Sequence, residues 1–418
     1  MRIAVIGAGA SGMIAAIEAS KKDDNTVTVF EKSNRVGKKI LSSGNGRCNF
    51  TNRFCDASHY HGSGAKLVEK VFERFDNVSV QKWFEDKGMI IREDRFGRLY
   101  PYSDRAGSVL DVLRMNLNRI NISVVMETEI VAVEKNEHGF ILFAQNGVIK
   151  DAVFDRVILA CGGLASKAIG GTERGYELLK GFGHCIVPLG AALTKIYSND
   201  ASLRQLQGIR TDAELTLVDS RMNKVAESKG EIQFTKEGIS GPAAFDVSRY
   251  VGSDWGERNW KGKSLIIDLC PFFSSEKLEL YFRKKIELYP DENAASMFTG
   301  CLHRMLGNAV LKKAGIQDGR KLGDLNDGDI KRLVFYSKGF QFVVSAVSKV
   351  ADAQVTTGGV DASEIKDTLE SVYVDGLYVT GELIDIDGDC GGYNLQWAWS
   401  SGYVAGNLAG EIENAESE

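Results

Sequence analysis

The segment MRIAVIGAGASGMIAAIEASKKDDNTVTVFEKS, residues 1–33, carries the strongest indication of the fold class. Its apolar run Ile3–Ile6 predicts a short strand that is buried on both faces. Residues 11–22 predict a helix, and residues 27–30 predict a second buried strand. A strand, a glycine-rich turn, a helix and a second strand in this order indicate a dinucleotide-binding unit of the Rossmann type.

The turn between the first strand and the helix contains Gly7, Gly9 and Gly12 in the G-x-G-x-x-G spacing. Gly7 is expected to make the tight turn, Gly9 to let a pyrophosphate approach the backbone, and Gly12 to allow close packing of helix and strand. The helix N-terminus, with Ala10 and Ser11, is expected to offer amide N–H groups and partial positive charge to the phosphates.

Glu31 ends the second strand, nineteen positions after Gly12. Its carboxylate is expected to accept hydrogen bonds from the hydroxyls of an adenosine ribose, and Lys32 beside it belongs to the same predicted site. The alternative is a glycine-rich turn followed by a surface glutamate. This fingerprint alone does not distinguish FAD from NAD.

A second glycine-rich loop, GKKILSSGNGRCNFTN at 37–52, follows closely. Such a loop can wrap an extended anion with backbone N–H groups and side-chain amides. A ligand longer than adenosine diphosphate must pass here, which favours FAD over NAD. The contacts predicted in this loop are Lys38, Lys39, Gly44, Asn45, Gly46 and Asn49.

The segment GDCGGYNLQWAWSSG, residues 388–402, predicts a helix that begins at about Tyr393. Its N-terminus is expected to point at the flavin or its pyrophosphate and to stabilise the negative charge of the reduced flavin. Trp397 and Trp399 are expected to pack in the core. The contacts predicted here are Gly381, Glu382, Asp389, Gly392, Tyr393, Asn394 and Leu395.

Four segments together resemble a bacterial family of NAD(P)/FAD-dependent oxidoreductases, the BaiN/YhiN type. This family includes aminoacetone oxidase-like flavoproteins and enzymes proposed for bile-acid dehydroxylation. The segments are GKKILSSGNGRCNFTN at 37–52, VILACGG at 157–163, GEIQFTKEGISGPAAFDVSR at 230–249 and TGELIDIDGDCGGYNLQWAWSSGYVAG at 380–406. The resemblance spans nearly the whole chain, but SKAIGGTERG at 166–175 replaces the proline and Ser-Thr-Gly run of the family.

The resemblance implies a glutathione-reductase-like FAD-binding domain that is interrupted by an insert. It also implies that Ala160, Gly162 and Gly163 meet the FAD at a strand end, and that the backbone of Val131 meets the adenine. The predicted class is therefore α/β, with a β-rich part and a helical part in the insert. The predicted domains are 1–190 (FAD-binding domain, first part), 191–355 (inserted substrate-side domain) and 356–418 (C-terminal return).

The composition of the chain limits its expected cellular location and the classes of partner that it is expected to bind. The net charge of −5 and the pI of about 5.8 argue against a nucleic-acid partner. The uncharged run at 3–17 is too short to span a bilayer. The seven cysteines contain no C-x-x-C pair, which favours free thiols in a reducing cytosol. We therefore expect a cytoplasmic protein without a membrane partner, while its oligomeric state stays open.

The predicted function is an FAD-dependent oxidoreductase that transfers hydride between a small organic substrate and flavin N5. Two alternatives remain for the electron partner: O₂ reoxidises the flavin, or NAD(P)H reduces it. No second G-x-G-x-x-G follows a predicted strand, so the sequence predicts no separate domain for NAD(P)H. The substrate is expected in a cleft between the FAD-binding domain and the insert. The alternative is a flavoprotein that serves as an electron-transfer or RNA-modification module.

No catalytic acid–base pair can be assigned from the sequence. His59 and His61 are candidate contacts near the site, whereas Cys48 and Cys390 are expected to be packed thiols. Asp389 closes an Asp-x-Asp-x-Asp run that resembles part of a calcium loop, but the distal glutamate of such a loop is missing. A turn rich in local hydrogen bonds is expected there instead, and no metal site is predicted.

Overall fold

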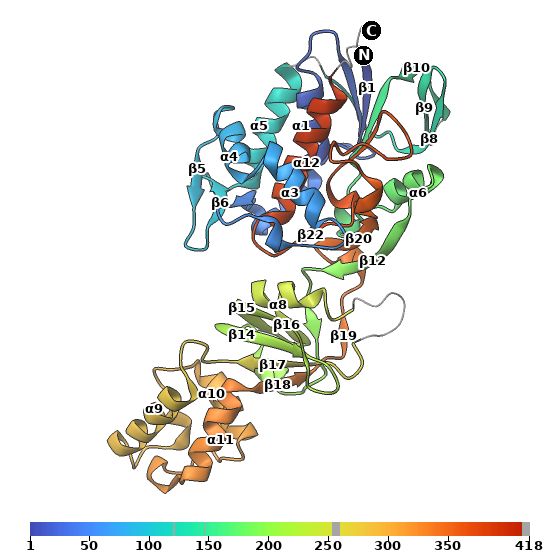
Figure 1. The fold of residues 1–418 in the computed structure, drawn as a ribbon. Helices are drawn as coiled ribbons and strands as arrows, with labels where there is room; N and C mark the ends of the chain where they lie inside the picture. The colour runs from blue at the N-terminus through green and yellow to red at the C-terminus, as the bar shows by residue number, and fades with distance from the viewer. Residues whose placement is uncertain (120–121, 146, 253–259, 412–418) are drawn as a thin grey trace. The chain divides into compact units, whose positions relative to one another are not determined.

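The computed structural model describes residues 1–119, 122–145, 147–252 and 260–411, and it divides the chain into two compact units (Figure 1). Unit 1 comprises Met1–Gly190 and Val350–Glu418, and unit 2 comprises Ala191–Lys349. Each unit has its own hydrophobic core. The second unit is therefore inserted between two parts of the first.

A five-stranded parallel sheet forms the centre of unit 1, in the order β21-β11-β1-β2-β7. Its strands are β1 (Arg2–Ile6), β2 (Thr26–Phe30), β7 (Ser123–Val125), β11 (Arg156–Leu159) and β21 (Leu377–Val379). The carboxyl ends of parallel strands meet at one edge of a sheet. The glycine loop after β1, Ala160 after β11 and Thr380 after β21 therefore lie at the same edge, although they are far apart in the sequence.

Two helices from opposite ends of the chain lie side by side on this sheet: α1 (Ala10–Ala19) and α12 (Tyr393–Ala409) (Figure 1). Small residues permit the close approach. A Cβ atom on Gly402 would lie 2.3 Å from the carbonyl oxygen of Ser11, and one on Gly406 would lie 2.3 Å from that of Ala15. Elements from the two ends of the chain therefore belong to one compact unit.

The other helices of unit 1 are α2 (Lys38–Ser42), α3 (Ala65–Arg74), α4 (Asn77–Glu85), α5 (Ala106–Arg119) and α6 (Arg174–Gly181). The segment between α4 and α5 contains the antiparallel pair β5 (Ile91–Glu93) and β6 (Arg98–Pro101). β3 (Thr51–Asn52) extends this pair to three strands. The remaining small sheets join β8 (Ile130–Asn136), β9 (Gly139–Ala144) and β10 (Gly147–Phe154); β4 (Tyr60–His61) and β22 (Asp387–Gly388); and β12 (Ile186–Ala192) and β20 (Val355–Val360).

Unit 2 is built on a seven-stranded sheet in the order β18-β17-β14-β15-β16-β13-β19. The strands are β13 (Ile196–Tyr197), β14 (Arg210–Val218), β15 (Lys224–Thr235), β16 (Gly238–Ser240), β17 (Ser264–Asp268), β18 (Phe340–Val343) and β19 (Ala346–Val347). Its helices are α7 (Leu203–Leu206), α8 (Pro242–Ser248), α9 (Ser275–Leu288), α10 (Arg304–Lys313) and α11 (Asp327–Lys338). The helices α9, α10 and α11 gather at one end of the unit, and β18 and β19 then return to complete the sheet (Figure 1).

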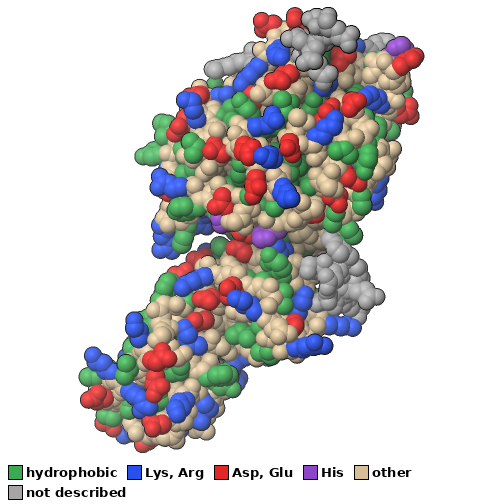
Figure 2. Space-filling model, in the orientation of Figure 1, with side chains coloured by type: hydrophobic (Ala, Val, Ile, Leu, Met, Phe, Trp, Pro, Cys, Tyr) green, Lys and Arg blue, Asp and Glu red, His purple; other side chains and the backbone are tan. Residues whose placement is uncertain are grey.

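On the visible surface of each unit, basic and acidic side chains are interspersed (Figure 2). None of the helices among the described residues is both long enough and apolar enough to cross a bilayer.

Candidate functional site

The glycine loop after β1 has two kinds of glycine. A Cβ atom on Gly7, whose φ is +108°, would lie 2.4 Å from the carbonyl oxygen of Ala160, and one on Gly12 would lie 1.9 Å from the carbonyl oxygen of Gly7. These two glycines are required by the packing of the protein itself. At Gly9, by contrast, an added Cβ would meet no atom within 4 Å. The backbone at Gly9 therefore faces open space, as a ligand-binding turn requires.

No side chain caps the N-terminus of α1. Its N-cap is Gly9, and the first turn carries no acidic residue. The first amide N–H groups of a helix have no partner within the helix and carry partial positive charge. Ala10 and Ser11 begin this turn, so the helix end fits a phosphate group.

The carboxylate of Glu31 is fixed beside the glycine loop. One of its oxygens accepts a hydrogen bond from the backbone N–H of Ala8 at 2.9 Å, and the other accepts one from the N–H of Ser33 at 2.8 Å. These bonds hold the side chain at the end of β2, where the half-buried Lys32 follows it. A carboxylate has further acceptor positions, so this one can still accept ribose hydroxyls.

The N-terminus of α12 repeats this arrangement from the other end of the chain. Its N-cap is Gly392 with a φ of +105°; no side chain caps the helix and no acidic residue lies in its first turn. Asn394 fixes the preceding loop, because its side chain accepts from the N–H of Gly388 and donates to the Gly388 carbonyl, each at 2.8 Å. Leu395, also in the first turn, is half-buried.

The space at Gly392 is taken by protein. A Cβ atom there would lie 2.7 Å from the carbonyl oxygen of Thr51 and 2.8 Å from Oδ1 of Asn49. Gly392 therefore allows α12 to begin close to β3, so it is required by the backbone of the protein whether or not a ligand is near.

The loop at 43–49 leaves one polar atom unsatisfied. Oδ1 of Asn49 is buried and has no hydrogen-bond partner among the described residues. The loop around it is wound in the left-handed region at Gly44, Asn45 and Gly46, and at Gly46 an added Cβ would meet nothing within 4 Å. A buried acceptor without a donor is costly, and an N–H donor of a bound ligand would satisfy it. The loop therefore fits an extended ligand.

A third part of the site joins the ends of β11 and β21. Nζ of Lys39 lies 3.2 Å from one carboxylate oxygen of Glu382, and the other oxygen accepts from the N–H of Thr356 at 2.8 Å. A Cβ on Gly163 would lie 2.6 Å from this carboxylate, and one on Gly162 would lie 3.9 Å from Lys39. Four predicted residues from three distant segments are thus brought together.

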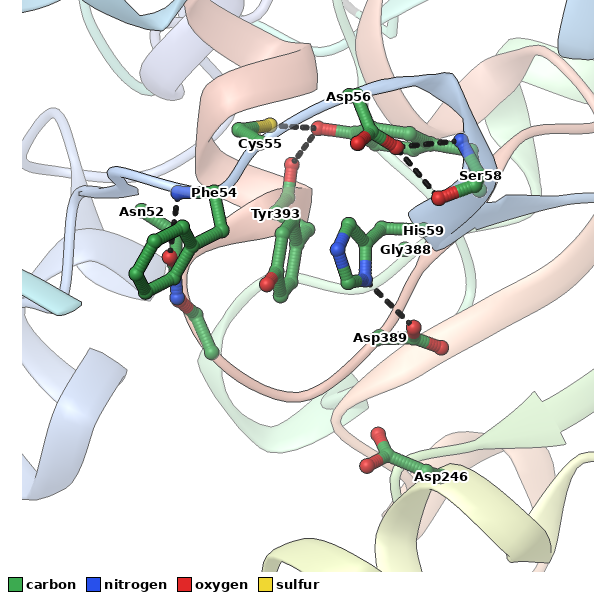
Figure 3. A network of polar contacts seen from close by, with 12 residues as sticks. Asn52, Phe54, Cys55, Asp56, Ser58, His59, Asp246, Gly388, Asp389 and Tyr393 are labelled. Carbon is green, nitrogen blue, oxygen red and sulfur yellow. Dashed lines mark hydrogen bonds and ion pairs between the residues drawn. The ribbon is translucent and has the colours of Figure 1, made fainter. Parts of the chain in front are cut away.

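Asp389 contacts two histidine side chains, and Figure 3 shows the contact with His59. Its two carboxylate oxygens lie 3.1 Å from Nδ1 of His59 and 2.7 Å from Nε2 of His61. The ring of His59 stacks on that of Tyr393 with 4.3 Å between the ring centres, and Tyr60 donates to the carbonyl oxygen of Tyr393 at 2.8 Å. Asp389 therefore ties the loop before α12 to the segment 59–61.

Burial disfavours the thiolate form of three cysteines in unit 1, Cys48, Cys55 and Cys161. Burial raises the pKa of Cys48 to about 12, although a hydrogen bond with Ser43 opposes the shift. Burial also raises the pKa of Cys55 and of Cys161 to about 12 each. The thiolate, which is the reactive form, is therefore scarce at neutral pH. The expectation that Cys48 is a packed thiol is confirmed.

The two tryptophans of α12 belong to the core, as expected. Trp397 and Trp399 are buried, and their indole N–H groups donate to the carbonyl oxygens of Gly381 at 3.0 Å and of Phe50 at 2.9 Å. Among the described residues, no group of three or more histidine, cysteine or acidic side chains is arranged to hold a metal ion.

Two predicted residues are less closely tied to this cluster. Lys38 in α2 and Val131 in β8 are half-buried, and among the described residues no ion pair of Lys38 is found. Sequence reasoning missed Thr356, which donates to Glu382, and Gln396, whose side chain accepts from Thr51 at 2.5 Å. No spacing rule connects residues so far apart in the chain, so only the fold shows these partners.

The family model described as "HI0933-like protein Rossmann domain" matches residues 1–408. The chain belongs to the HI0933-like family. The family resemblance, the Rossmann-type α/β fold and the enzyme class predicted from the sequence, an FAD-dependent oxidoreductase, are confirmed.

Relatives of this HI0933-like chain carry two different names. The chain is 36% identical over 412 residues to a 3-dehydro-bile acid delta(4,6)-reductase of Clostridium scindens, covering 98% of this chain and 99% of the relative. It is 28% identical over 408 residues to a ribosomal RNA dihydrouridine synthase of Haemophilus influenzae, covering 96% of each chain. A synthase of the same name from Escherichia coli is 28% identical over 402 residues, again covering 96% of each chain.

Among solved structures, the chain is similar in fold to the 3-ketosteroid delta1-dehydrogenase of Sterolibacterium denitrificans. The TM-score is 0.51 at 12% sequence identity, and the match covers 98% of this chain and 99% of that chain. At this identity, the likeness concerns the fold alone.

Proposed function

We propose that unit 1 holds FAD between the N-termini of α1 and α12 and that the protein reduces a carbon–carbon double bond conjugated to a carbonyl group. The observation that carries the proposal is the pair of helix N-termini in one unit, each starting at a glycine and neither capped by a side chain. A dinucleotide has two charged parts that such helix ends stabilise: the pyrophosphate and the anionic reduced flavin.

The residues of this chain then have distinct tasks. Gly9 and the first turn of α1 bind the pyrophosphate, and Glu31 accepts hydrogen bonds from the ribose. The first turn of α12 directs its N–H groups at the flavin, and the buried Oδ1 of Asn49 accepts a hydrogen bond from the cofactor. Bound FAD supplies a centre for hydride transfer.

Asp389 and Glu382 position the site. Asp389 holds the loop before α12 through His59 and His61, so that the helix begins at the correct place. Glu382 neutralises Lys39 and ties it to the end of β21, which keeps the ammonium group beside Gly162. Neither carboxylate is assigned a proton-transfer step.

The reductive direction is supported by the names of the relatives. The name of the Clostridium scindens relative denotes reduction of double bonds at positions 4 and 6 of a 3-oxo compound. Dihydrouridine is uridine with two added hydrogen atoms on a carbon–carbon double bond that is conjugated to a carbonyl group. The two substrates differ in size, but the bond that changes is of one chemical kind. A 3-oxo steroid acid is the first candidate because that relative has the higher identity.

RNA is the second candidate substrate, and the relatives named for ribosomal RNA favour it. Unit 2 carries 24 lysine and arginine residues against 20 aspartate and glutamate residues, whereas the whole chain is acidic. The visible surface, however, shows both signs interspersed over unit 2 (Figure 2). The absence of a nucleic-acid partner therefore stays a prediction, as do the cytoplasmic location and the predicted position of the substrate.

Anaerobic flavin spectroscopy tests this proposal. The FAD-loaded protein is first reduced by titration with NADPH, NADH or dithionite. Each candidate substrate, the steroid or the RNA, is then added as the oxidant in the absence of O₂. We expect a conjugated 3-oxo-4,6-diene steroid to restore the oxidised flavin spectrum within seconds, whereas its saturated analogue leaves the flavin reduced. Restoration by a uridine-containing RNA alone would select the second candidate. A flavin that only O₂ reoxidises would overturn the proposed reduction.

The electron donor is decided by the same titration. Bleaching by NADPH or NADH would identify a nicotinamide nucleotide as the donor, which is one of the two alternatives that the sequence leaves open. Bleaching by an amine, with peroxide formed in air, would instead indicate an oxidase.

A further inference from the structure

Unit 2 contains a hollow of about 690 Å³ that the proposed FAD site does not use. We call it the insert pocket. It is lined by Tyr197, Ser198, Asn199, Asp200, Ala201, Arg204, Lys236, Glu237, Ser345 and Ala346. All of these residues belong to unit 2. The turn at Lys236 and Glu237 lies within the stretch 230–249 on which the family resemblance partly depends, so this stretch lines a pocket.

The walls of the insert pocket are fixed by backbone contacts. The N–H of Ser198 donates to the carbonyl oxygen of Glu237, and the N–H of Ser345 donates to that of Tyr197, each at 2.9 Å. A Cβ atom on Gly238 would lie 2.0 Å from the carbonyl oxygen of Ile196, so β16 can approach β13 only with glycine there. The side chains on the rim therefore project from a rigid frame.

The acidic groups of the pocket already have partners. Burial opposes the ionisation of Asp200, but hydrogen bonds from Ser202 outweigh burial and lower the pKa of the carboxyl. Asp200 also lies 3.7 Å from Nζ of Lys313. The carboxylate of Glu237 lies 3.5 Å from Nζ of Lys195. Each negative charge at the pocket is thus offset by a neighbouring lysine.

The two basic residues of the lining have no such partner. Among the described residues, neither Arg204 nor Lys236 forms an ion pair or a side-chain hydrogen bond, and both are exposed. The pocket and its immediate neighbours therefore carry four positive charges and two negative ones. The positive charges belong to Arg204, Lys236, Lys195 and Lys313, and the negative charges belong to Asp200 and Glu237. The pocket therefore attracts anions, and its serine and asparagine side chains offer hydrogen bonds to an oxyanion.

We propose that the insert pocket is a second binding site, which takes a phosphate-bearing ligand between Arg204 and Lys236. Arginine and lysine side chains lining one pocket suit the oxygens of a phosphate, the arginine through its planar fork and the lysine as a point charge. The half-buried Tyr197 adds an aromatic wall, over which the ammonium of Lys195 lies 4.2 Å from the ring centre. A pyrophosphate group, present in a nicotinamide dinucleotide, and the backbone of a single-stranded RNA share this chemistry.

Calorimetric titration of FAD-loaded protein with inorganic pyrophosphate tests the site. Loading with FAD fills the proposed phosphate position at α1, so that this position does not compete. We expect saturable binding that R204Q/K236Q weakens at least tenfold. The matched double variant R221Q/K277Q removes the same charge from exposed positions outside the pocket and should change the affinity less than twofold. Glu237→Gln removes a negative charge from the rim and should strengthen binding.

Two further titrations identify the source of the phosphate. Binding of NADP⁺ that R204Q/K236Q abolishes would indicate a nucleotide, and binding of oligouridylate with the same loss would indicate RNA. For RNA, the double variant should also make the salt dependence of binding shallower. Absence of pyrophosphate binding, or equal weakening by R204Q/K236Q and R221Q/K277Q, would overturn the proposal.

Discussion

Gly402 of α12 lies directly on Ser11 of α1: a Cβ atom on the glycine would lie 2.3 Å from the serine carbonyl oxygen. Ser11 belongs to the first dozen residues of the chain, and Gly402 belongs to its last helix. Oγ of Ser11 also receives a hydrogen bond from Thr380 at 3.2 Å, at the end of β21. One small residue of α1 thus contacts both C-terminal elements of the Rossmann-type unit.

Gly402→Ala should destabilise the protein by about 3 kcal/mol, because the added methyl meets a backbone atom that cannot move independently. Urea unfolding measures the change. Gly107→Ala is the matched control, since this glycine also lies in a helix but an added Cβ would meet nothing within 4 Å. The control should raise stability by up to about 1 kcal/mol, because alanine favours a helix over glycine. Equal effects of the two substitutions would contradict the close helix contact.

Gly9→Val should leave the fold intact and remove FAD binding. Its side chain projects into open space, so the free energy of unfolding of the apoprotein should change by less than about 1 kcal/mol. The same space is needed by the pyrophosphate, so the FAD dissociation constant should rise at least a hundredfold in a fluorescence titration. Gly12→Val should instead prevent folding, because its Cβ meets the Gly7 carbonyl. A fully yellow Gly9→Val protein would place the cofactor elsewhere.

Glu31→Ala should weaken FAD binding by about tenfold, which is the loss of roughly one charge-assisted hydrogen bond. The carboxylate also holds the N–H groups of Ala8 and Ser33, so some thermal stability should be lost as well. Equilibrium dialysis of FAD separates the two effects. Glu69→Ala, at an exposed position of α3, should bind FAD like the wild type. Unchanged FAD affinity in Glu31→Ala would refute the ribose contact.

Cys48 should resist alkylation in the folded protein. With a pKa of about 12, only about one molecule in ten thousand carries the thiolate at pH 8. Iodoacetamide labelling followed by peptide mass spectrometry should show rapid modification of the exposed Cys185 and none of Cys48. Labelling in urea should modify both. Rapid labelling of native Cys48 would contradict its burial.

Unit 1 should lose stability as the pH falls below 6.5. Burial lowers the pKa of His184 from 6.5, while its hydrogen bond with Glu364 opposes the shift. The unfolded chain therefore takes up a proton before the folded one does, and the free energy of unfolding decreases by up to about 1.4 kcal/mol per pH unit in that range. The stability that depends on a neutral His184 is fully present above pH 6.5. Urea unfolding at pH 8, 6 and 5 measures it.

The control for this pH dependence is a second histidine. His184→Gln should flatten the decrease between pH 6.5 and 5, whereas His138→Gln, at an exposed site, should leave the slope unchanged. If His184→Gln and the wild type lose stability in parallel, the buried imidazole is not responsible.

Much of the fold was predictable from local patterns. The glycine spacing after β1, the apolar strands and the Gly-Gly start of α12 depend on residues that are near one another in sequence. Local rules also predicted that Trp397 and Trp399 are core residues. They did not predict that β18 and β19 return after the helices to complete the sheet of unit 2, because strand pairing depends on contacts between distant segments.

The candidate site was predicted as a set of residues, but not as an arrangement. The sequence placed Lys39, Gly163 and Glu382 in one site, without any sign that the lysine pairs with the glutamate. It also presented Asp389 as a cofactor contact, whereas the fold gives its carboxylate two histidine partners. Charges that are more than 300 residues apart in the chain interact only after folding brings them within a few ångströms.

Sequence patterns alone predicted that a Rossmann-type unit begins with a strand at Ile3–Ile6 and that the last helix begins at about Tyr393, because glycine spacing and hydrophobic periodicity act over short segments. The folded structure was needed to show which glycines face open space and which face protein. Gly9 and Gly392 are the same residue type in the sequence. In the fold, Gly9 adjoins a space that can admit a ligand, whereas Gly392 adjoins Thr51. The free volume around a backbone atom is a property of its packed neighbours, and the fold alone supplies them.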